Sequence, residues 1–170
     1  MKAVVKIDHK LTNQIRTWGQ PAYGFWNFVA GQSIAIYVLV AALFAYFGYL
    51  ALGFYLIVFL SSYVIAILLQ HFIRRPRPNF EKLTGYKLWV ETYSCPSAHA
   101  TVSAAAAASL GLLTTFPSSG LAIITIVCSI GFAFLIGVSR IIVGVHYLGD
   151  VMFGWMLGCV IASGYLMVLN

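Results

Sequence analysis

Long apolar stretches without charge alternate with short polar stretches along the chain. The uncharged residues form three runs, at 17–73, 92–139 and 151–170. A helix needs about 20 mostly apolar residues to cross the roughly 30 Å hydrocarbon core of a bilayer. The first two runs are each long enough for two crossings, and the last run is long enough for one. The pattern therefore predicts an all-α integral membrane helical bundle with five transmembrane helices, at about 28–47, 51–72, 99–116, 121–139 and 148–169.

Turn-forming residues divide the two long runs. Gly48 interrupts the first run, and the segment 116–120, Phe-Pro-Ser-Ser-Gly, interrupts the second. Each long run is therefore expected to leave one side of the membrane and return to it. All charged residues lie within 1–16, 74–91 and 140–150. We expect these three stretches to face the same water compartment.

The N-terminal segment has the pattern of an amphipathic helix. Apolar residues recur at helical spacing, and lysines stand between them. Such a helix is expected to lie in the headgroup layer of the membrane; a frayed basic tail is the alternative. We expect 1–170 to form a single domain, with 1–27 as the interfacial helix and its lead-in and 28–170 as the transmembrane core. The apolar positions of the interfacial helix are Val4, Ile7, Leu11, Ile15 and Trp18.

The composition agrees with a membrane protein and excludes other classes. Charged residues make up 8% of the chain and hydrophobic residues 61%, with a mean hydropathy of +0.91. Soluble domains contain about a quarter charged residues. A soluble globular enzyme, a disordered chain and a nucleic-acid-binding module are therefore excluded, although the net charge is +6. Cys95, Cys128 and Cys159 have no spacing typical of a disulfide framework or a metal site.

Polar clusters lie at the ends of predicted spans, where ionisable groups are costly and usually mark function. The first, 74–78, is Arg-Arg-Pro-Arg-Pro. Its guanidinium groups suit a phosphate, although a basic flank that anchors a helix end would have the same composition. The second, 96–99, is Pro-Ser-Ala-His. It opens the third span, and the free N–H groups of a helix N-terminus also suit a phosphate. The alternative there is a helix cap followed by an interfacial histidine.

The third cluster, 139–150, contains a histidine and an acid four residues apart. On a helix, His146 and Asp150 would share a face and could touch. A carboxylate that accepts a hydrogen bond from one imidazole nitrogen fixes the tautomer and leaves the other nitrogen as a base or nucleophile. Asp150 is the only acid after Glu91 and opens an otherwise uncharged span. We therefore interpret the pair as functional.

Together the three clusters resemble the pattern of the type 2 phosphatidic acid phosphatase (PAP2) superfamily, membrane lipid phosphatases related to vanadium haloperoxidases. The family pattern is K-x6-R-P, then P-S-G-H, then S-R-x5-H-x3-D. In this chain Arg77-Pro78 ends the first element and 96–99 forms the second. Ser139-Arg140, His146 and Asp150 complete the third.

The chain departs from the family pattern at two positions. Gln70 stands where the family has its lysine, so one positively charged phosphate ligand is absent there. Arg74 or Arg75, about one helical turn further on, is the candidate to replace it. Ala98 stands where the family has glycine.

The resemblance implies a role for each matching residue. His146 would attack phosphorus to form a phosphohistidine, and Asp150 would orient the imidazole and stabilise its positive charge. His99 would protonate the leaving group and then activate the water that hydrolyses the intermediate. Neither a metal nor another cofactor is implied, and the sequence has no metal-binding motif such as H-E-x-x-H. The phosphoryl oxygens would be held by Arg77, Ser97 and Arg140, with Arg74, Arg75 and Gln70 as further candidates.

The resemblance implies an integral membrane lipid phosphatase whose partners are the bilayer and a phosphorylated lipid. Candidate substrates are lipid A 1-phosphate, undecaprenyl diphosphate, phosphatidylglycerophosphate and phosphatidate. Two alternatives stay open: a lipid-to-lipid phosphotransferase with the same fold, and a non-catalytic lipid-binding or transport relative. The positive-inside rule would place the cationic stretches in the cytoplasm. The resemblance instead implies an active face toward the periplasm or outside of a bacterial inner membrane, and we follow the resemblance.

Overall fold

Helices make up all the regular structure that a computed structural model describes, over residues 2–46, 49–78, 92–112 and 119–169. No strand occurs in these ranges, so the predicted all-α class is confirmed. In chain order the elements are α1 (Lys2–Gly19), the 3₁₀ turn η1 (Gln20–Ala22), α2 (Tyr23–Gly31), α3 (Ser33–Tyr46), α4 (Tyr49–Ile73), α5 (Ala98–Leu112), α6 (Ser119–Ile142) and α7 (Leu148–Leu169).

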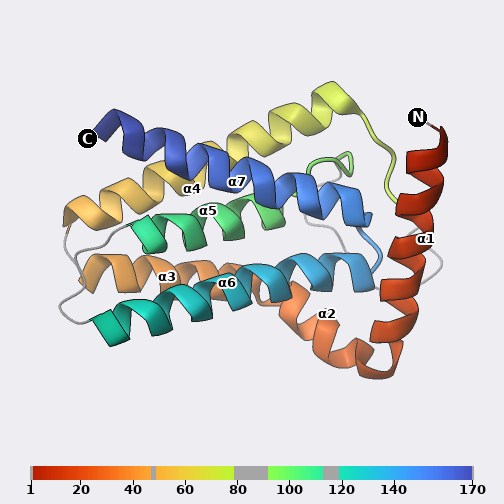
Figure 1. The fold of residues 1–170 in the computed structure, drawn as a ribbon, viewed down its shortest axis with the longest axis horizontal. Coiled ribbons are helices and arrows are strands. Elements are labelled where there is room, and N and C mark those ends of the chain that lie inside the picture. Colours follow the sequence, from red (N-terminus) through yellow and green to blue (C-terminus); the bar gives the residue numbers. More distant parts are fainter. Residues whose placement is uncertain (1, 47–48, 79–91, 113–118, 170) are drawn as a thin grey trace.

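Helices α3 to α7 lie side by side along the long axis of the molecule, and α1 crosses one end of them (Figure 1). α5 packs against α4, α6 and α7. The exit of α4, the start of α5 and the connection between α6 and α7 all lie toward the end that α1 covers (Figure 1). The fold therefore brings the three polar clusters of the sequence to one end of the bundle.

Glycines let α7 approach α5 closely. A Cβ atom added at Gly154 would lie 2.8 Å from the carbonyl oxygen of Ser97. A Cβ atom added at Gly158 would meet the carbonyl oxygen of Thr101 and would lie 2.8 Å from the backbone nitrogen of Ala105. Backbone atoms cannot move aside as the end of a flexible side chain can. The G-x-x-x-G of α7 therefore sets the spacing between these two helices.

The predicted span at 28–47 is wrong as one continuous helix. α2 ends just before Gln32, which has φ −88° and ψ 7°, and α3 begins at Ser33. The break places Ala30 against Val143, just after α6, in a buried apolar cluster. The prediction missed the break because it rested on uncharged runs, and Gly31, Gln32 and Ser33 are small or polar but carry no charge.

Two helical segments in the described part of the chain are long and apolar enough to cross a membrane, Leu52–Ile73 and Leu148–Tyr165. A shorter apolar segment, Ile126–Ile142, lies in α6. The five-span arrangement therefore stays a prediction. The predicted turn at Gly48 lies outside the described residues, as does most of the predicted turn at 116–120.

We predict that Gly158→Ala destabilises the bundle by about 1–3 kcal/mol, the usual cost of overpacking, because the new Cβ meets the backbone of α5. Gly164→Ala is the matched control in the same helix, since nothing lies within 4 Å of its added Cβ. That variant should keep or slightly raise stability because alanine favours helix over glycine. Thermal unfolding of both variants in detergent micelles measures the difference. Equal melting temperatures would contradict the proposed contact.

Candidate active site

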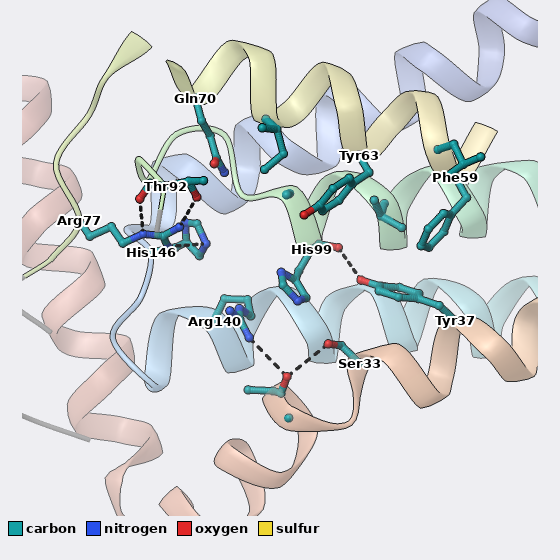
Figure 2. Close-up of a pocket in the computed structure, with 16 residues that line it drawn as sticks. Ser33, Tyr37, Phe59, Tyr63, Gln70, Arg77, Thr92, His99, Arg140 and His146 are labelled. Atoms are coloured by element: carbon teal, nitrogen blue, oxygen red, sulfur yellow. Dashed lines mark hydrogen bonds between the residues drawn. The ribbon is translucent and has the colours of Figure 1, made fainter. Parts of the chain in front are cut away.

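A cavity of about 490 Å³ lies among α3, α4, α5 and α6 (Figure 2). One part of its wall is apolar and another part is polar. Aromatic and aliphatic side chains from α3, α4 and α5 line much of it, and polar side chains gather at one part. The polar group includes Gln70, Arg77, Thr92, His99, Arg140 and His146.

A glycine with a positive φ turns the chain from α6 toward the cavity. Gly144 has φ +85°, a conformation that residues with a side chain rarely adopt. Its N–H donates to the carbonyl oxygen of Ile141 at 3.0 Å. The N–H groups of Val145 and His146 donate to the carbonyl oxygen of Arg140 at 3.2 and 3.3 Å. This turn caps the C-terminus of α6 and brings His146 back to the cavity.

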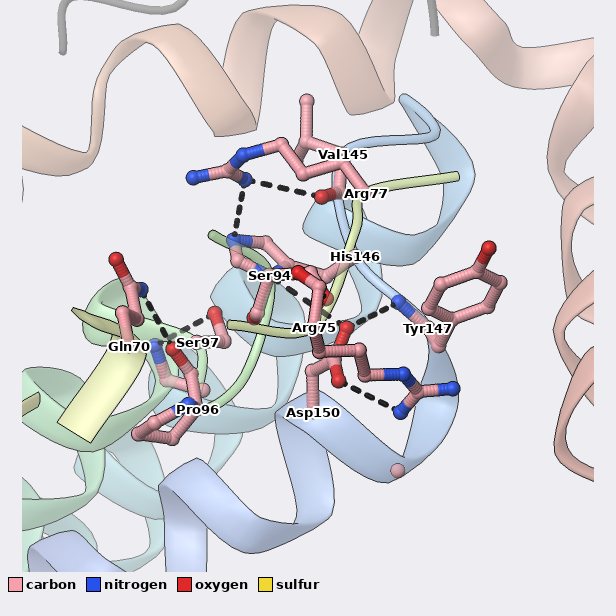
Figure 3. Close-up of polar contacts among 12 residues, drawn as sticks. Gln70, Arg75, Arg77, Ser94, Pro96, Ser97, Val145, His146, Tyr147 and Asp150 are labelled. Carbon is pink, nitrogen blue, oxygen red and sulfur yellow. Dashed lines mark hydrogen bonds and ion pairs between the residues drawn. The ribbon is translucent and has the colours of Figure 1, made fainter. Parts of the chain in front are cut away.

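Polar contacts at both ring nitrogens hold His146 in one orientation (Figure 3). Nδ1 lies 2.7 Å from the carbonyl oxygen of Ser94, which can only accept, so Nδ1 carries the proton. Nε2 lies 3.2 Å from Nη1 of Arg77, which can only donate. These contacts assign the neutral Nδ1–H tautomer and leave the lone pair on Nε2.

The surroundings of His146 also keep its ring uncharged. Burial lowers the pKa of His146 to about 4 because it disfavours the imidazolium form. The carboxylate of Asp150 opposes this shift, whereas the guanidinium groups of Arg77 and Arg140 add to it. His146 is therefore neutral at physiological pH, as a nitrogen nucleophile must be.

Asp150 lies behind His146, and its side chain is 0% exposed. Oδ2 accepts a hydrogen bond from the N–H of Tyr147 at 2.8 Å and lies 3.8 Å from Nδ1 of His146. Oδ1 accepts a hydrogen bond from Nη1 of Arg75 at 2.7 Å. The predicted geometry, in which His146 and Asp150 share a helix face, is wrong because α7 begins at Leu148, after the histidine. The two side chains meet across the N-terminal turn of α7 instead.

Arg77 is fixed beside Nε2 of His146. Its Nε and Nη2 donate to the carbonyl oxygen and the hydroxyl of Thr92, at 2.7 and 2.9 Å. Its Nη1 donates to the carbonyl oxygen of Val145 at 3.0 Å. The guanidinium is therefore positioned in advance for an anionic group that approaches Nε2.

Other predicted site residues line the same cavity from separate helices. His99, in the first turn of α5, is half-buried. Arg140, in the last turn of α6, is buried, and its Nη1 donates to the carbonyl oxygen of Ala30 at 3.3 Å. Gln70, at the end of α4, donates from Nε2 to the carbonyl oxygen of Pro96 at 2.6 Å. Residues from all three sequence motifs thus lie around one cavity.

Ser97, Arg74 and Arg75 are not among the residues that line the cavity. The Ser97 hydroxyl accepts the N–H of the residue three further on at 3.4 Å, the arrangement of a helix N-cap. Arg74 is exposed, and its Nε donates to a carbonyl oxygen of α4 at 3.1 Å. Arg75 pairs with carboxylates outside the cavity. Of the candidates near the family lysine position, the structure places Gln70 at the cavity.

Sequence reasoning missed several groups that hold the site. The carbonyl oxygen of Ser94 fixes the His146 ring, and a backbone acceptor leaves no sequence signal. The Tyr37 hydroxyl donates to the carbonyl oxygen of His99 at 3.0 Å. Asp8 pairs with a guanidinium at 2.6 Å. Asp8 is the single acid in the basic stretch 1–16, and that signal could have identified it.

The arrangement suits the transfer of a phosphoryl group. Such a reaction needs a nucleophile, positive charge around the phosphoryl oxygens and a proton donor for the leaving group. His146, Arg77 with Arg140, and His99 offer these functions around one cavity. In the described ranges, no three His, Cys, Asp or Glu side chains gather as a metal-binding group.

Known proteins with a similar sequence or fold include phosphatases. The model of the PAP2 superfamily matches residues 48–170. Since this match covers most of the chain, the chain belongs to the PAP2 superfamily. It is 33% identical over 102 residues to decaprenylphosphoryl-5-phosphoribose phosphatase of Mycobacterium tuberculosis, in strains CDC 1551 and H37Rv. The alignment covers 60% of this chain and 52% of those proteins, so the chain spans about half the length of these curated relatives.

Two solved structures share the fold. The transmembrane PAP2-type phosphatidylglycerolphosphate phosphatase of Bacillus subtilis superposes with a TM-score of 0.78 and 20% identity, over 100% of this chain and 89% of that chain. LpxE of Aquifex aeolicus superposes with a TM-score of 0.71 and 23% identity, over 93% of each chain.

We predict that His146 keeps the neutral Nδ1–H form at pH 6, where a histidine with the ordinary pKa of 6.5 is largely protonated. The ¹⁵N NMR shifts of the ring in the full chain measure this, and a charged ring at pH 6 would contradict the assignment.

The unfolded chain takes up the proton near pH 6.5 and the folded chain near pH 4. The contribution of His146 to stability is therefore lost as the pH falls through this window.

Proposed function

We propose that this chain is an integral membrane lipid phosphatase that removes a terminal phosphate from a phospholipid or lipid diphosphate, without a metal ion, through a phosphohistidine at His146. The observation that carries the proposal is the environment of His146. Its neutral ring holds a lone pair on Nε2 beside the Arg77 guanidinium, at a cavity with largely apolar walls.

The reaction proceeds in two steps. In the first, Nε2 of His146 attacks phosphorus, an N–P bond forms, and the P–O bond to the leaving group breaks while His99 gives that oxygen a proton. In the second, His99 takes a proton from water as the water oxygen attacks phosphorus. The N–P bond then breaks, inorganic phosphate leaves, and His146 regains its lone pair.

The fixed polar groups stabilise the charges that develop. The phosphorylated imidazole carries positive charge, which the Ser94 carbonyl and the Asp150 carboxylate stabilise from the Nδ1 side. Arg77 and Arg140 hold the phosphoryl oxygens, since guanidinium groups match their charge and geometry. Ser97 contributes by capping the start of α5, which carries His99.

The apolar part of the cavity supports a lipid substrate. Leu60 and Tyr63 line the cavity and are also 59% and 40% exposed on the outside of α4. The cavity lining therefore continues onto the outer surface of the bundle, where an acyl or polyprenyl tail would extend. The apolar and aromatic lining residues include Tyr37, Phe59, Leu60, Tyr63, Ile67 and Val102.

Outward-facing apolar side chains support a membrane location. Only 22% of the most apolar window of α4, and 28% of that of α7, is buried, whereas a core helix of a soluble protein is mostly buried. Leu39 on α3 and Val127 on α6 are likewise exposed. We propose that α3 to α7 are five spans, that α1 lies in the headgroup layer, and that the site faces the periplasm or outside of a bacterial inner membrane.

The relatives suggest which substrates to test. The Mycobacterium tuberculosis proteins are named for a phosphorylated ribose on a decaprenyl phosphate, and the Bacillus subtilis structure is named for phosphatidylglycerol phosphate. Both names describe a terminal phosphate on a membrane lipid. A test panel contains these two lipids together with lipid A 1-phosphate, undecaprenyl diphosphate and phosphatidate.

We predict that the purified chain in mixed micelles releases phosphate from at least one lipid of the panel. His146→Ala should abolish release, and His99→Ala should slow it by about 10²–10⁴-fold, the usual contribution of an acid–base group. His71→Ala is the matched histidine control, because His71 is exposed and does not line the cavity. Equal release by wild type and His146→Ala would favour a non-catalytic relative. Phosphate on an added acceptor lipid would favour a phosphotransferase.

Phosphate release should continue in excess EDTA, because guanidinium groups supply the positive charge that a metal ion supplies in other phosphoryl-transfer sites. The measurement compares initial rates with and without EDTA, and then after addition of Mg²⁺. A rate that disappears in EDTA and returns with Mg²⁺ would show that the proposed chemistry is wrong.

A further inference from the structure

Asp8 belongs to α1, which contributes none of the residues that line the cavity, yet it contacts the supports of the site. Its Oδ2 accepts a hydrogen bond from Nη2 of Arg75 at 2.6 Å. Its Oδ1 accepts the N–H of Gly149, in the first turn of α7, at 2.9 Å. One turn further along α1, the hydroxyl of Thr12 accepts the N–H of Leu148 at 2.9 Å. α1 therefore caps the helix that begins beside His146.

Arg75 lies between two carboxylates. Its Nη1 donates to Asp150 at 2.7 Å (Figure 3), and its Nη2 donates to Asp8. Its guanidinium carbon lies 4.2 Å from the centre of the Tyr147 ring, on which the His9 ring stacks at 4.5 Å. The side chains of Arg75 and Asp8 are 24% and 14% exposed. Water screens such a partly buried cluster weakly, so its charges act on neighbouring groups.

The charges of this cluster do not cancel. Asp8 and Asp150 are negative and Arg75 is positive, so together they carry one net negative charge. Without the charge of Asp8, the cation would balance Asp150, and the cluster would be neutral. Oδ2 of Asp150 lies 3.8 Å from Nδ1 of His146. His146 therefore meets a net negative charge on its Nδ1 side.

The other ionisable groups that face His146 are two arginines, which are cationic, and a histidine, which becomes cationic when it takes up a proton. Arg77 faces it from the segment after α4, Arg140 from α6 and His99 from α5. Among the described residues, Asp150 with its partners is thus the negative side of the His146 environment. A change in the charge of that side should alter how readily the ring takes positive charge.

We propose that Asp8 is a positioning residue of the active site: by offsetting the charge of Arg75, it preserves the negative field of Asp150 on His146 and so favours the positively charged phosphohistidine. The kinetic part of this inference rests on the proposed function, whereas the electrostatic part concerns His146 alone. α1 is thereby a functional support of the site as well as a surface helix.

The test uses the full chain in micelles, with the His146 titration followed by ¹⁵N NMR and phosphate release followed in parallel. Asp8→Asn keeps the size of the side chain and an acceptor for Gly149 but removes the charge. We expect a lower pKa of His146 and a kcat reduced about tenfold, the lower end of the loss seen when the groups that orient metal-ligating side chains are replaced. KM should change little, because Asp8 is not among the cavity-lining residues.

A second variant reverses the sign of the effect. Arg75→Met removes the cation, leaves both carboxylates, and should raise the pKa of His146. Arg75→Lys keeps the charge, and its His146 titration should stay closer to that of wild type than to that of Asp8→Asn. If Arg75→Met does not fold, the comparison of Arg75→Lys with Asp8→Asn still tests the inference.

Two controls separate charge from helix capping. Thr12→Val removes the other α1 contact with α7 without changing any charge, so it should lower thermal stability and leave the His146 titration unchanged. Asn13→Lys makes the same unit change in charge as Asp8→Asn on an exposed position of α1. It should leave both the titration and kcat unchanged.

The outcomes distinguish this inference from the proposed function. Shifts of the same sign for Asp8→Asn and Arg75→Met, or a Thr12→Val shift as large as that of Asp8→Asn, would overturn the role of Asp8 even if the wild type releases phosphate. Opposite shifts in a chain that hydrolyses no lipid of the panel would support the coupling of Asp8 to His146 and overturn the proposed phosphatase activity.

Discussion

The backbones of α5 and α7 approach so closely that Gly154 and Gly158 face carbonyl oxygens of the neighbouring helix. At the same contact the N–H of Ser97 donates to the carbonyl oxygen of Asp150 at 3.0 Å. This bond joins the residue before α5 to the first turn of α7. Because His99 stands in the first turn of α5 and His146 just before α7, the helix contact determines how far apart the two imidazoles lie. A side chain in place of either glycine would separate the two imidazoles as well as the helices.

The burial of Asp150 imposes a second constraint on the same end of the bundle. A buried carboxylate is stable only when its oxygens are paired, and here the Tyr147 N–H and Arg75 satisfy them. Arg75 is itself partly removed from water and is paired in turn with Asp8. The requirement to pair buried charges thus extends from the cavity to the surface helix. It gives a physical reason why an amphipathic N-terminal helix packs across this end of the bundle.

The sequence predicts the structure well where the pattern is long and uniform. The predicted helices at 51–72 and 148–169 agree with α4 and α7, because a charged residue marks one end of each helix: Arg74 directly follows α4, and Asp150 lies in the first turn of α7. The prediction from uncharged runs did not include the break at Gln32, because Gly31, Gln32 and Ser33 interrupt the apolar pattern without a charge. For the site, the motif order placed the histidines and Arg140 near one ligand, and all of them line one cavity. The motif singled out Arg77, which lines that cavity, but it left Arg74 and Arg75 as further candidates, and neither of these lines it. Arg74 has φ +53° and is exposed, and Arg75 pairs with carboxylates. The contact between the Ser94 carbonyl oxygen and His146 could not be predicted from the sequence either, because every residue has a backbone carbonyl.

The two cavity histidines differ in their surroundings, and the difference fits the roles proposed for them. His146 is buried, with Nδ1 bonded to a carbonyl oxygen that cannot donate. Its proton therefore stays on one nitrogen and its lone pair on the other, which is what a nucleophile requires. His99 is only half-buried and stands in the cavity wall. An acid–base group must release and regain a proton in each turnover, so it needs contact with water or the leaving group. If the two environments were exchanged, the nucleophile would lose the Ser94 carbonyl oxygen that fixes its tautomer, and the acid–base group would be cut off from the water that it must activate.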